Sequence, residues 1–194
     1  DMVAMMERRV YDMAGLTNAS VKVYLNNEKV KIADFETYVN IFLTPEERAK
    51  SEHVYEKLHD RWEIVAMPSS NEFEQVSFVN GIYTGKGGKH VSYIMRMIGD
   101  GLKTYIKKTK KIDVDQNHIN NNVMIFVKST IVNPNFTSQI KDCLETNVSS
   151  FGSRCSIDEA FVKRLAKTGI VERIIEFYEF KQKRLLEKTD GKLQ

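Results

Sequence analysis

Apolar residues recur at helical spacing in three parts of the chain. From Val91 to Ile106 they fall three or four positions apart, which predicts one apolar stripe on a helix about five turns long. A similar stripe starts at Ile170 and predicts a second long helix with a heavily charged outer face. Residues 1–14 predict a third helix, with Gly15 as its expected C-cap.

Shorter apolar runs predict strands. Residues 123–132 are apolar on both faces, which is typical of a buried central strand. Two pairs of runs predict hairpins, one closed by a tight turn at Asn26-Asn27 and the other by a turn-rich link at residues 68–72. The four runs are VKVYL (21–25) and EKVKI (28–32), then RWEIVAM (61–67) and EFEQVSFVNGIY (72–83).

Two helix starts carry a capping signal. Asp34 is expected to cap the helix that follows it, and Ser156 with Glu159 forms a predicted capping box for a helix near residues 157–167. Residues 44–60 are polar and mixed in charge, so we expect a connector and a domain boundary there. The elements predicted after residue 60 follow the order strand–strand–helix–strand–helix–helix. This order predicts an α+β fold with helices on one face of a small sheet.

Composition adds one local feature. The 194 residues are 42% apolar, enough to fill the core of one domain or one and a half, and a net charge of +3 does not demand a nucleic-acid partner. The stretch KTYIKKTKK, Lys103 to Lys111, nevertheless holds five lysines and no acid. It is either a solvated helix end favoured by the helix dipole or a surface that contacts phosphate, and both interpretations stay open at this point.

No metal or disulfide pattern is present in the sequence. Eleven residues lie between Cys143 and Cys155, and the four histidines are scattered. Neither a signal peptide nor a membrane span is recognised, so we expect a reducing intracellular compartment. The chain starts at Asp1 inside a predicted helix, and we expect it to be a piece of a longer protein.

The stretch SFVNGIYTGKGGKHVSYI (77–94) resembles a phosphate-binding loop but lacks its spacing. A Walker loop needs four residues between its glycines and a hydroxyl after the lysine. Here three residues separate Gly81 from Gly85, and Gly87 follows Lys86. The glycines therefore predict a strand-to-helix connection in which φ is positive.

A series of short sequence motifs along the chain resembles eukaryotic type II DNA topoisomerase, in its ATPase and transducer region. The motifs occur in the order found in that family: RRVYDMAG, VKVYLN, HDRWEI, VSFVNGI, GKGGKHV, NPNFTSQIKDCL, SFGS and GIVERIIEF. The resemblance implies the end of a split-ATPase domain of the gyrase, heat-shock-ninety and histidine-kinase type at residues 1–60. It implies a transducer domain at residues 61–194, with a fold similar to the second domain of small-subunit ribosomal protein five and a long C-terminal helix.

The resemblance also assigns roles to two groups of residues. The family's Gln-Thr-Lys loop, whose lysine reaches the γ-phosphate, corresponds to Gln139, Ile140 and Lys141, with Ile where the family usually has Thr. The family's triple lysine faces the cavity through which DNA passes. Its counterparts here are Lys107, Lys108 and Thr109, followed by Lys110 and Lys111.

The implied function is coupling of γ-phosphate sensing to DNA strand passage in a nuclear, homodimeric enzyme without a membrane. In the family, ATP closes an N-terminal dimer around a transported duplex. ATP and Mg²⁺ would serve the full-length enzyme, while this chain holds no complete site for either and is expected to be inactive alone. The alternative is a stand-alone nucleic-acid-binding α+β module without ATP coupling.

Overall fold

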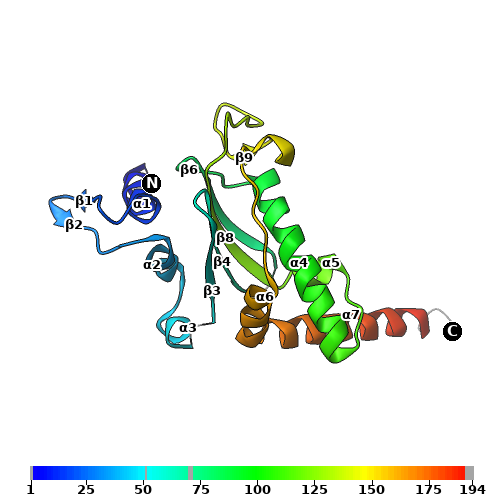
Figure 1. Ribbon diagram of the computed structural model, residues 1–194. Coiled ribbons are helices and arrows are strands. Elements are labelled where there is room, and N and C mark those ends of the chain that lie inside the picture. Colours follow the sequence, from blue (N-terminus) through cyan, green and yellow to red (C-terminus); the bar gives the residue numbers. More distant parts are fainter. Residues whose placement is uncertain (1, 51, 70–71, 191–194) are drawn as a thin grey trace.

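The computed structural model describes residues 2–50, 52–69 and 72–190. It comprises an N-terminal segment, a central sheet and a layer of helices (Figure 1). The N-terminal elements are α1 (Met2–Leu16), β1 (Tyr24–Leu25), β2 (Glu28–Lys29), α2 (Phe35–Val39), a 3₁₀ turn η1 (Asn40–Phe42) and α3 (Pro45–Lys50). The strands that follow are β3 (Val54–His59), β4 (Trp62–Pro68), β5 (Glu74–Val79), β6 (Ile82–Tyr83), β7 (Gly87–Gly88), β8 (Val123–Ser129) and β9 (Cys143–Leu144). The later helices are α4 (Lys89–Lys110), α5 (Gln116–Asn120), η2 (Val148–Ser150), α6 (Glu159–Leu165), a π-helical turn η3 (Ala166–Ile170) and α7 (Val171–Asp190).

The main sheet has five strands in the order β3-β4-β8-β5-β6. The central position of β8 confirms the prediction made from its apolar faces. It pairs antiparallel with β4 and parallel with β5. The predicted hairpin between residues 61–67 and 72–83 is therefore wrong, because β8 lies between these strands.

Residues 54–59, which we expected in a connector, form the edge strand β3. This strand pairs antiparallel with β4, so the real hairpin turns at Asp60-Arg61. Only Val54 of the six residues is buried. An edge strand that is only partly buried carries a polar sequence, and its pattern therefore resembles that of a connector.

The helices of the second half lie on one face of the sheet, as expected (Figure 1). The apolar stripe of α4 is buried there, with Ile94, Ile98 and Leu102 fully inaccessible. Gly101 allows α6 to approach closely, since a Cβ atom on it would lie 2.6 Å from Val162 Cγ2. The N-cap of α6 is Asp158, whose Oδ1 accepts a 2.7 Å hydrogen bond from the amide of Phe161, so the predicted capping box at Ser156 is wrong.

The other face of the sheet is covered by the N-terminal segment. Phe35, Tyr38 and Val39 of α2 pack against Phe78 and Phe126 of the sheet. As predicted, Asp34 caps α2, accepting a 2.7 Å hydrogen bond from the Thr37 amide. The β1–β2 turn is also confirmed, with φ of 49° at Asn26 and 67° at Asn27.

Helix α1 forms as predicted, but most of its apolar residues are not buried by the described chain, Ala14 being an exception. Met2, Met5 and Met6 are 71%, 73% and 62% exposed. Gly15 lies inside the helix rather than after it, where a Cβ atom would be 2.4 Å from Tyr38 Cβ. This glycine therefore serves close packing of α1 on α2 rather than helix termination.

Candidate functional site

The glycine-rich stretch is a strand-to-helix junction, which confirms the sequence interpretation. Gly87 and Gly88 have φ of 71° and 128°, and α4 begins at the next residue. These two glycines form β7, which pairs in parallel with β9 at Cys143 and Leu144. A Cβ atom on Gly88 would lie 2.4 Å from the carbonyl oxygen of Leu144, so only glycine fits this contact.

A buried network of polar side chains connects the junction to the sheet. The hydroxyl oxygens of Ser77 and Thr84 are 2.6 Å apart, and Thr84 Oγ1 lies 3.2 Å from His90 Nε2. Burial lowers the pKa of His90 to about 3, so this side chain is neutral near pH 7. The first turn of α4 is therefore tied to β5 by uncharged hydrogen bonds.

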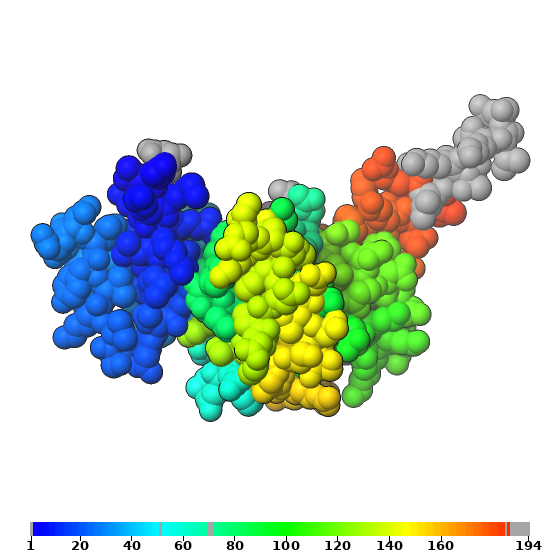
Figure 2. All heavy atoms as spheres, turned by 90° about the horizontal axis from the view of Figure 1, so that it is seen from above, coloured from blue at the N-terminus to red at the C-terminus, as the bar shows by residue number. Residues whose placement is uncertain are grey.

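The β7–β9 pairing brings the loop of residues 133–147 to the start of α4. Hydrogen bonds close the base of this loop: the Glu145 amide donates to Asn135 O at 2.8 Å, and the Asn135 amide donates to Thr146 Oγ1 at 2.7 Å. Higher in the loop, the Thr137 amide donates to Cys143 O at 3.1 Å. Figure 2 looks down on this end of the molecule and shows the loop atoms, coloured yellow-green to yellow, uncovered on that face.

The predicted site residues Gln139, Ile140 and Lys141 form the tip of the loop. The Lys141 amide donates to Ser138 O at 3.1 Å, which closes a turn, and Lys141 has a left-handed φ of 62°. Gln139 is exposed, Lys141 is half-buried and Ile140 is 81% exposed. Among the described residues, no carboxylate lies within 4.0 Å of the Lys141 ammonium group. An unpaired lysine on a hydrogen-bonded turn can act as a point charge on phosphate.

The exposed position of Ile140 bears on the departure from the family pattern. The Ile140 side chain is exposed, and the turn is closed by backbone groups of Ser138 and Lys141 without a side chain from position 140. The turn backbone in this chain therefore does not need a hydroxyl at position 140.

The C-terminal part of the lysine stretch, Lys107 to Lys111, which we call the lysine run, occupies the last turn of α4 and the residue after it. Lys107, Lys108 and Lys110 are exposed, Lys111 is a left-handed C-cap with φ of 60°, and Thr109 Oγ1 donates to Tyr105 O at 2.8 Å.

Acids from other segments partly balance this charge. Lys110 lies 3.9 Å from Glu172 of α7, and Lys103 lies 3.6 Å from Asp113. Within the described part of the chain, Lys107, Lys108 and Lys111 have no ion-pair partner. These three lysines thus have no carboxylate within 4.0 Å among the described residues, although the pKa of Glu159 is lowered by its hydrogen bond with Lys163 and in part by the charge of Lys108.

The loop and the lysine run lie at opposite ends of α4. At ~1.5 Å per residue, the 22 residues of this helix separate the two groups by roughly 33 Å. Figure 1 shows β9 beside the first turn of α4 and α7 beside its last turns. A shift of the loop can therefore move the lysine run only through α4 and the elements packed on it.

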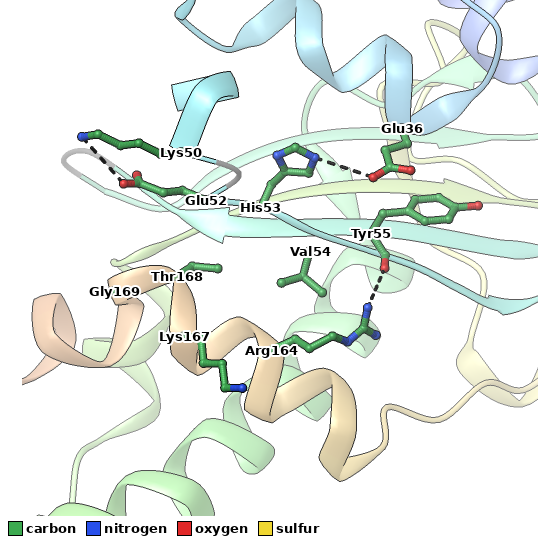
Figure 3. Close-up of a pocket in the computed structure, with 10 residues that line it drawn as sticks. All are labelled: Glu36, Lys50, Glu52, His53, Val54, Tyr55, Arg164, Lys167, Thr168 and Gly169. Atoms are coloured by element: carbon green, nitrogen blue, oxygen red, sulfur yellow. Dashed lines mark hydrogen bonds and ion pairs between the residues drawn. The ribbon is translucent and has the colours of Figure 1, made fainter. Parts of the chain in front are cut away.

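A hollow of about 670 Å³ lies elsewhere, along the free edge of β3 (Figure 3). Arg164 forms an ion pair with Glu56 and donates to Tyr55 O at 3.5 Å, while His53 Nε2 lies 3.8 Å from Glu36 Oε1. Lys50, His53 and Arg164 thus each pair with a carboxylate, whereas Lys167 has no carboxylate within 4.0 Å among the described residues. None of the predicted site residues lines this hollow, and its described residues present no nucleophile beside a base.

Two further findings concern cofactors and membranes. Among residues 2–50, 52–69 and 72–190, no three histidine, cysteine, aspartate or glutamate side chains gather to hold a metal ion. Within the same ranges, no helix combines the length and apolar character needed to cross a membrane.

Comparison with known proteins identifies relatives over nearly the whole chain. The family model described as DNA gyrase B matches residues 18–192. The Arabidopsis thaliana protein named DNA topoisomerase 2 is 40% identical over 98% of this chain, which spans 13% of that protein's length. The solved ATPase region of Saccharomyces cerevisiae topoisomerase II is 38% identical, with a TM-score of 0.82 over 91% of this chain and 45% of that structure. The ATPase and transducer domains of DNA topoisomerase II from Balamuthia mandrillaris give 35% identity and a TM-score of 0.83 over 94% of this chain and 46% of that structure.

Proposed function

The chain belongs to the DNA gyrase B family, and on this premise we propose that it couples γ-phosphate sensing to DNA strand passage in an ATP-dependent type II DNA topoisomerase. It would contain the end of the ATPase domain and the transducer domain. Its similarity to the Balamuthia mandrillaris structure, which comprises ATPase and transducer domains, supports this division. The pairing of β3 with β4 favours a division before Val54 rather than at residue 60.

The observation that carries the proposal is the connection between the two predicted sites. Lys141 stands on an exposed turn, and the base of its loop pairs with the two glycines directly before α4. The far end of α4 carries three unpaired lysines. A phosphate bound at one end would therefore bias the position of a rigid helix whose other end faces DNA.

The residues present fit one part of an ATP site. Lys141 fits the terminal phosphate as a point charge, because it has no acidic partner among the described residues. ATP with Mg²⁺ supplies the γ-phosphate whose hydrolysis drives the reaction. The adenine pocket, the Mg²⁺ ligands and the tyrosine that cleaves DNA would come from other parts of the full-length enzyme. Double-stranded DNA, a second copy of the enzyme and the nucleus are the partners and location that this proposal entails.

Hydrolysis by a Lys141→Ala variant of the full-length enzyme tests the proposal. A lost charge-assisted hydrogen bond of about 2–3 kcal/mol corresponds to a ~30- to 150-fold slower turnover. ADP has no γ-phosphate, so its affinity should not change. Lys163→Ala is the matched control, because Lys163 is exposed on α6 and pairs only with Glu159 at 3.0 Å among the described residues. Turnover by Lys141→Ala at the rate of Lys163→Ala would contradict the proposed role.

The stand-alone nucleic-acid-binding module is not favoured. Its support is the lysine run, but relatives named DNA topoisomerase 2 match 98% of the chain, the loop at Lys141 included. A module without ATP coupling would give no reason for a loop fastened to α4.

A further inference from the structure

A second lysine lies close to the turn that carries Lys141, and it contacts the residue directly after it. Lys86 Nζ lies 2.7 Å from Asp142 Oδ2, and the Lys86 amide donates to Asp142 O at 2.8 Å. Lys86 therefore holds Asp142 at two points, one through its side chain and one through its backbone. The hydrogen bond lowers the pKa of Asp142 and raises the pKa of Lys86, so both groups are charged at neutral pH.

The carboxylate of Asp142 connects Lys86 to the turn itself. Its Oδ1 lies 3.5 Å from the hydroxyl of Ser138, the residue whose carbonyl accepts the Lys141 amide. The turn needs such support because a side-chain-bearing residue with φ of 62° is intrinsically disfavoured. Lys86, Asp142 and Ser138 thus form a chain of contacts that ends on the backbone of Lys141.

Lys86 is poorly suited to bind phosphate itself. Asp142 already neutralises its charge at 2.7 Å, whereas Lys141 has no acidic partner among the described residues. Although the Lys86 side chain is 76% exposed, the side chain of Asp142 is only 21% exposed. The ammonium side of the pair is open to solvent, and solvent-screened ion pairs contribute little to folding stability. The pair can therefore set the position of a loop without being needed for the fold.

We propose that Lys86 is a positioning residue: its ion pair with Asp142 holds the 138–141 turn so that Lys141 is presented to the terminal phosphate in a fixed position. This rests on the proposed function of Lys141. A preorganised cation loses less freedom when phosphate binds and acts more strongly in the closed state.

The test compares Lys86→Met, Lys86→Arg and Lys89→Met in the full-length enzyme, with Lys141→Ala as reference. Lys89 is the matched control, since it lies on the same junction but donates to Asn147 Oδ1 at 2.6 Å rather than to the loop tip. Four quantities are measured: the melting temperature, hydrogen exchange of the peptide covering residues 138–142, ATP hydrolysis and ADP affinity.

Lys86→Met should leave the melting temperature and ADP affinity unchanged but speed exchange in this peptide. We expect hydrolysis to fall by about tenfold, less than the ~100-fold that a 1 Å misplacement of a reacting group can cost, because β7–β9 still holds the loop base. Lys86→Arg should restore both readouts, and Lys89→Met should change neither.

Two results overturn the inference, and they differ. In the first, Lys141→Ala slows ATP hydrolysis, but Lys86→Met shows wild-type hydrogen exchange in the 138–142 peptide and wild-type hydrolysis. Lys86 then does not position Lys141, and the proposed function stands. If Lys141→Ala itself turns over normally, the proposed function fails and the positioning role fails with it.

Discussion

The lysine run makes a quantitative prediction for DNA binding. Replacing Lys107, Lys108, Lys110 and Lys111 together by alanine should remove most of the salt dependence of duplex binding. Each phosphate neutralised contributes about 0.9 to the slope of log affinity against log salt. Lys107, Lys108 and Lys111 have no ion-pair partner in the described part of the chain, so we expect a slope near −2.7 for the unaltered chain.

Lys110 sets the upper limit of this estimate. It lies 3.9 Å from Glu172, and both side chains are about half exposed, so phosphate can replace the carboxylate at small cost. A fourth contact would bring the slope to about −3.6. The fourfold variant should approach zero slope and keep its fold, because all four lysines are exposed and alanine favours a helix at positions 107, 108 and 110.

Fluorescence anisotropy of a labelled duplex across roughly 50–200 mM salt measures the slope. The matched control replaces Lys163 and Lys167, two lysines near the C-terminal end of α6, by alanine. Binding should not depend on duplex sequence, since contacts to phosphate carry no base information. A slope that is unchanged in the fourfold variant would refute the assignment and move the DNA contact to another surface, such as the charged face of α7.

Three further predictions concern the junction and the nucleotide. Gly88→Ala should destabilise the chain by about 2 kcal/mol or more in urea unfolding, because a Cβ atom would meet Leu144 O at 2.4 Å; Gly81→Ala, with φ of 78° and open space around it, should cost only about 1 kcal/mol. His90 has a folded-state pKa of about 3, below the unfolded value of 6.5, so its contribution to the free energy of unfolding is complete above pH 6.5 and is about 2 kcal/mol smaller at pH 5. The His90→Gln variant should lose stability less steeply between these pH values. Equal pH dependence of unfolding in the variant and the wild type would contradict this prediction. The 194-residue chain should show no micromolar affinity for an ATP analogue in calorimetry, because one charge-assisted hydrogen bond of about 1.5–3 kcal/mol falls short of the ~4 kcal/mol needed for millimolar binding.

Elements with a strong local pattern could be predicted from the sequence. The apolar stripe of α4 and the apolar run of β8 each identify one structure, because their burial follows from spacing within a single segment. The cluster of glycines before a predicted helix likewise predicts the positive φ angles found at Gly87 and Gly88.

The features that the sequence did not predict depend on contacts between segments far apart in the chain. The insertion of β8 between β4 and β5 depends on pairing between distant segments. The turn-rich sequence of residues 68–72 instead favours a hairpin between its two neighbouring strands, which is wrong. The apolar residues of α1 indicate a helix but not whether the described chain covers them. Lys86 and Asp142 are 56 positions apart, so their contact has no local signal in either segment. The proposed roles of Lys141 and of the lysine run rest on the family resemblance, because the sequence pattern alone does not distinguish a solvated lysine from one that contacts phosphate.

Clamp closure on circular DNA tests the central claim most directly. The full-length enzyme is given a non-hydrolysable ATP analogue, and the DNA retained at high salt reports the closed state. Because Lys141 can favour closure only by contacting the γ-phosphate more strongly in that state, Lys141→Ala should lower the closed-to-open ratio by ~30- to 150-fold. ADP affinity and the Lys163→Ala control should match wild type. Closure of Lys141→Ala at the wild-type level would contradict the claim that this chain senses the γ-phosphate.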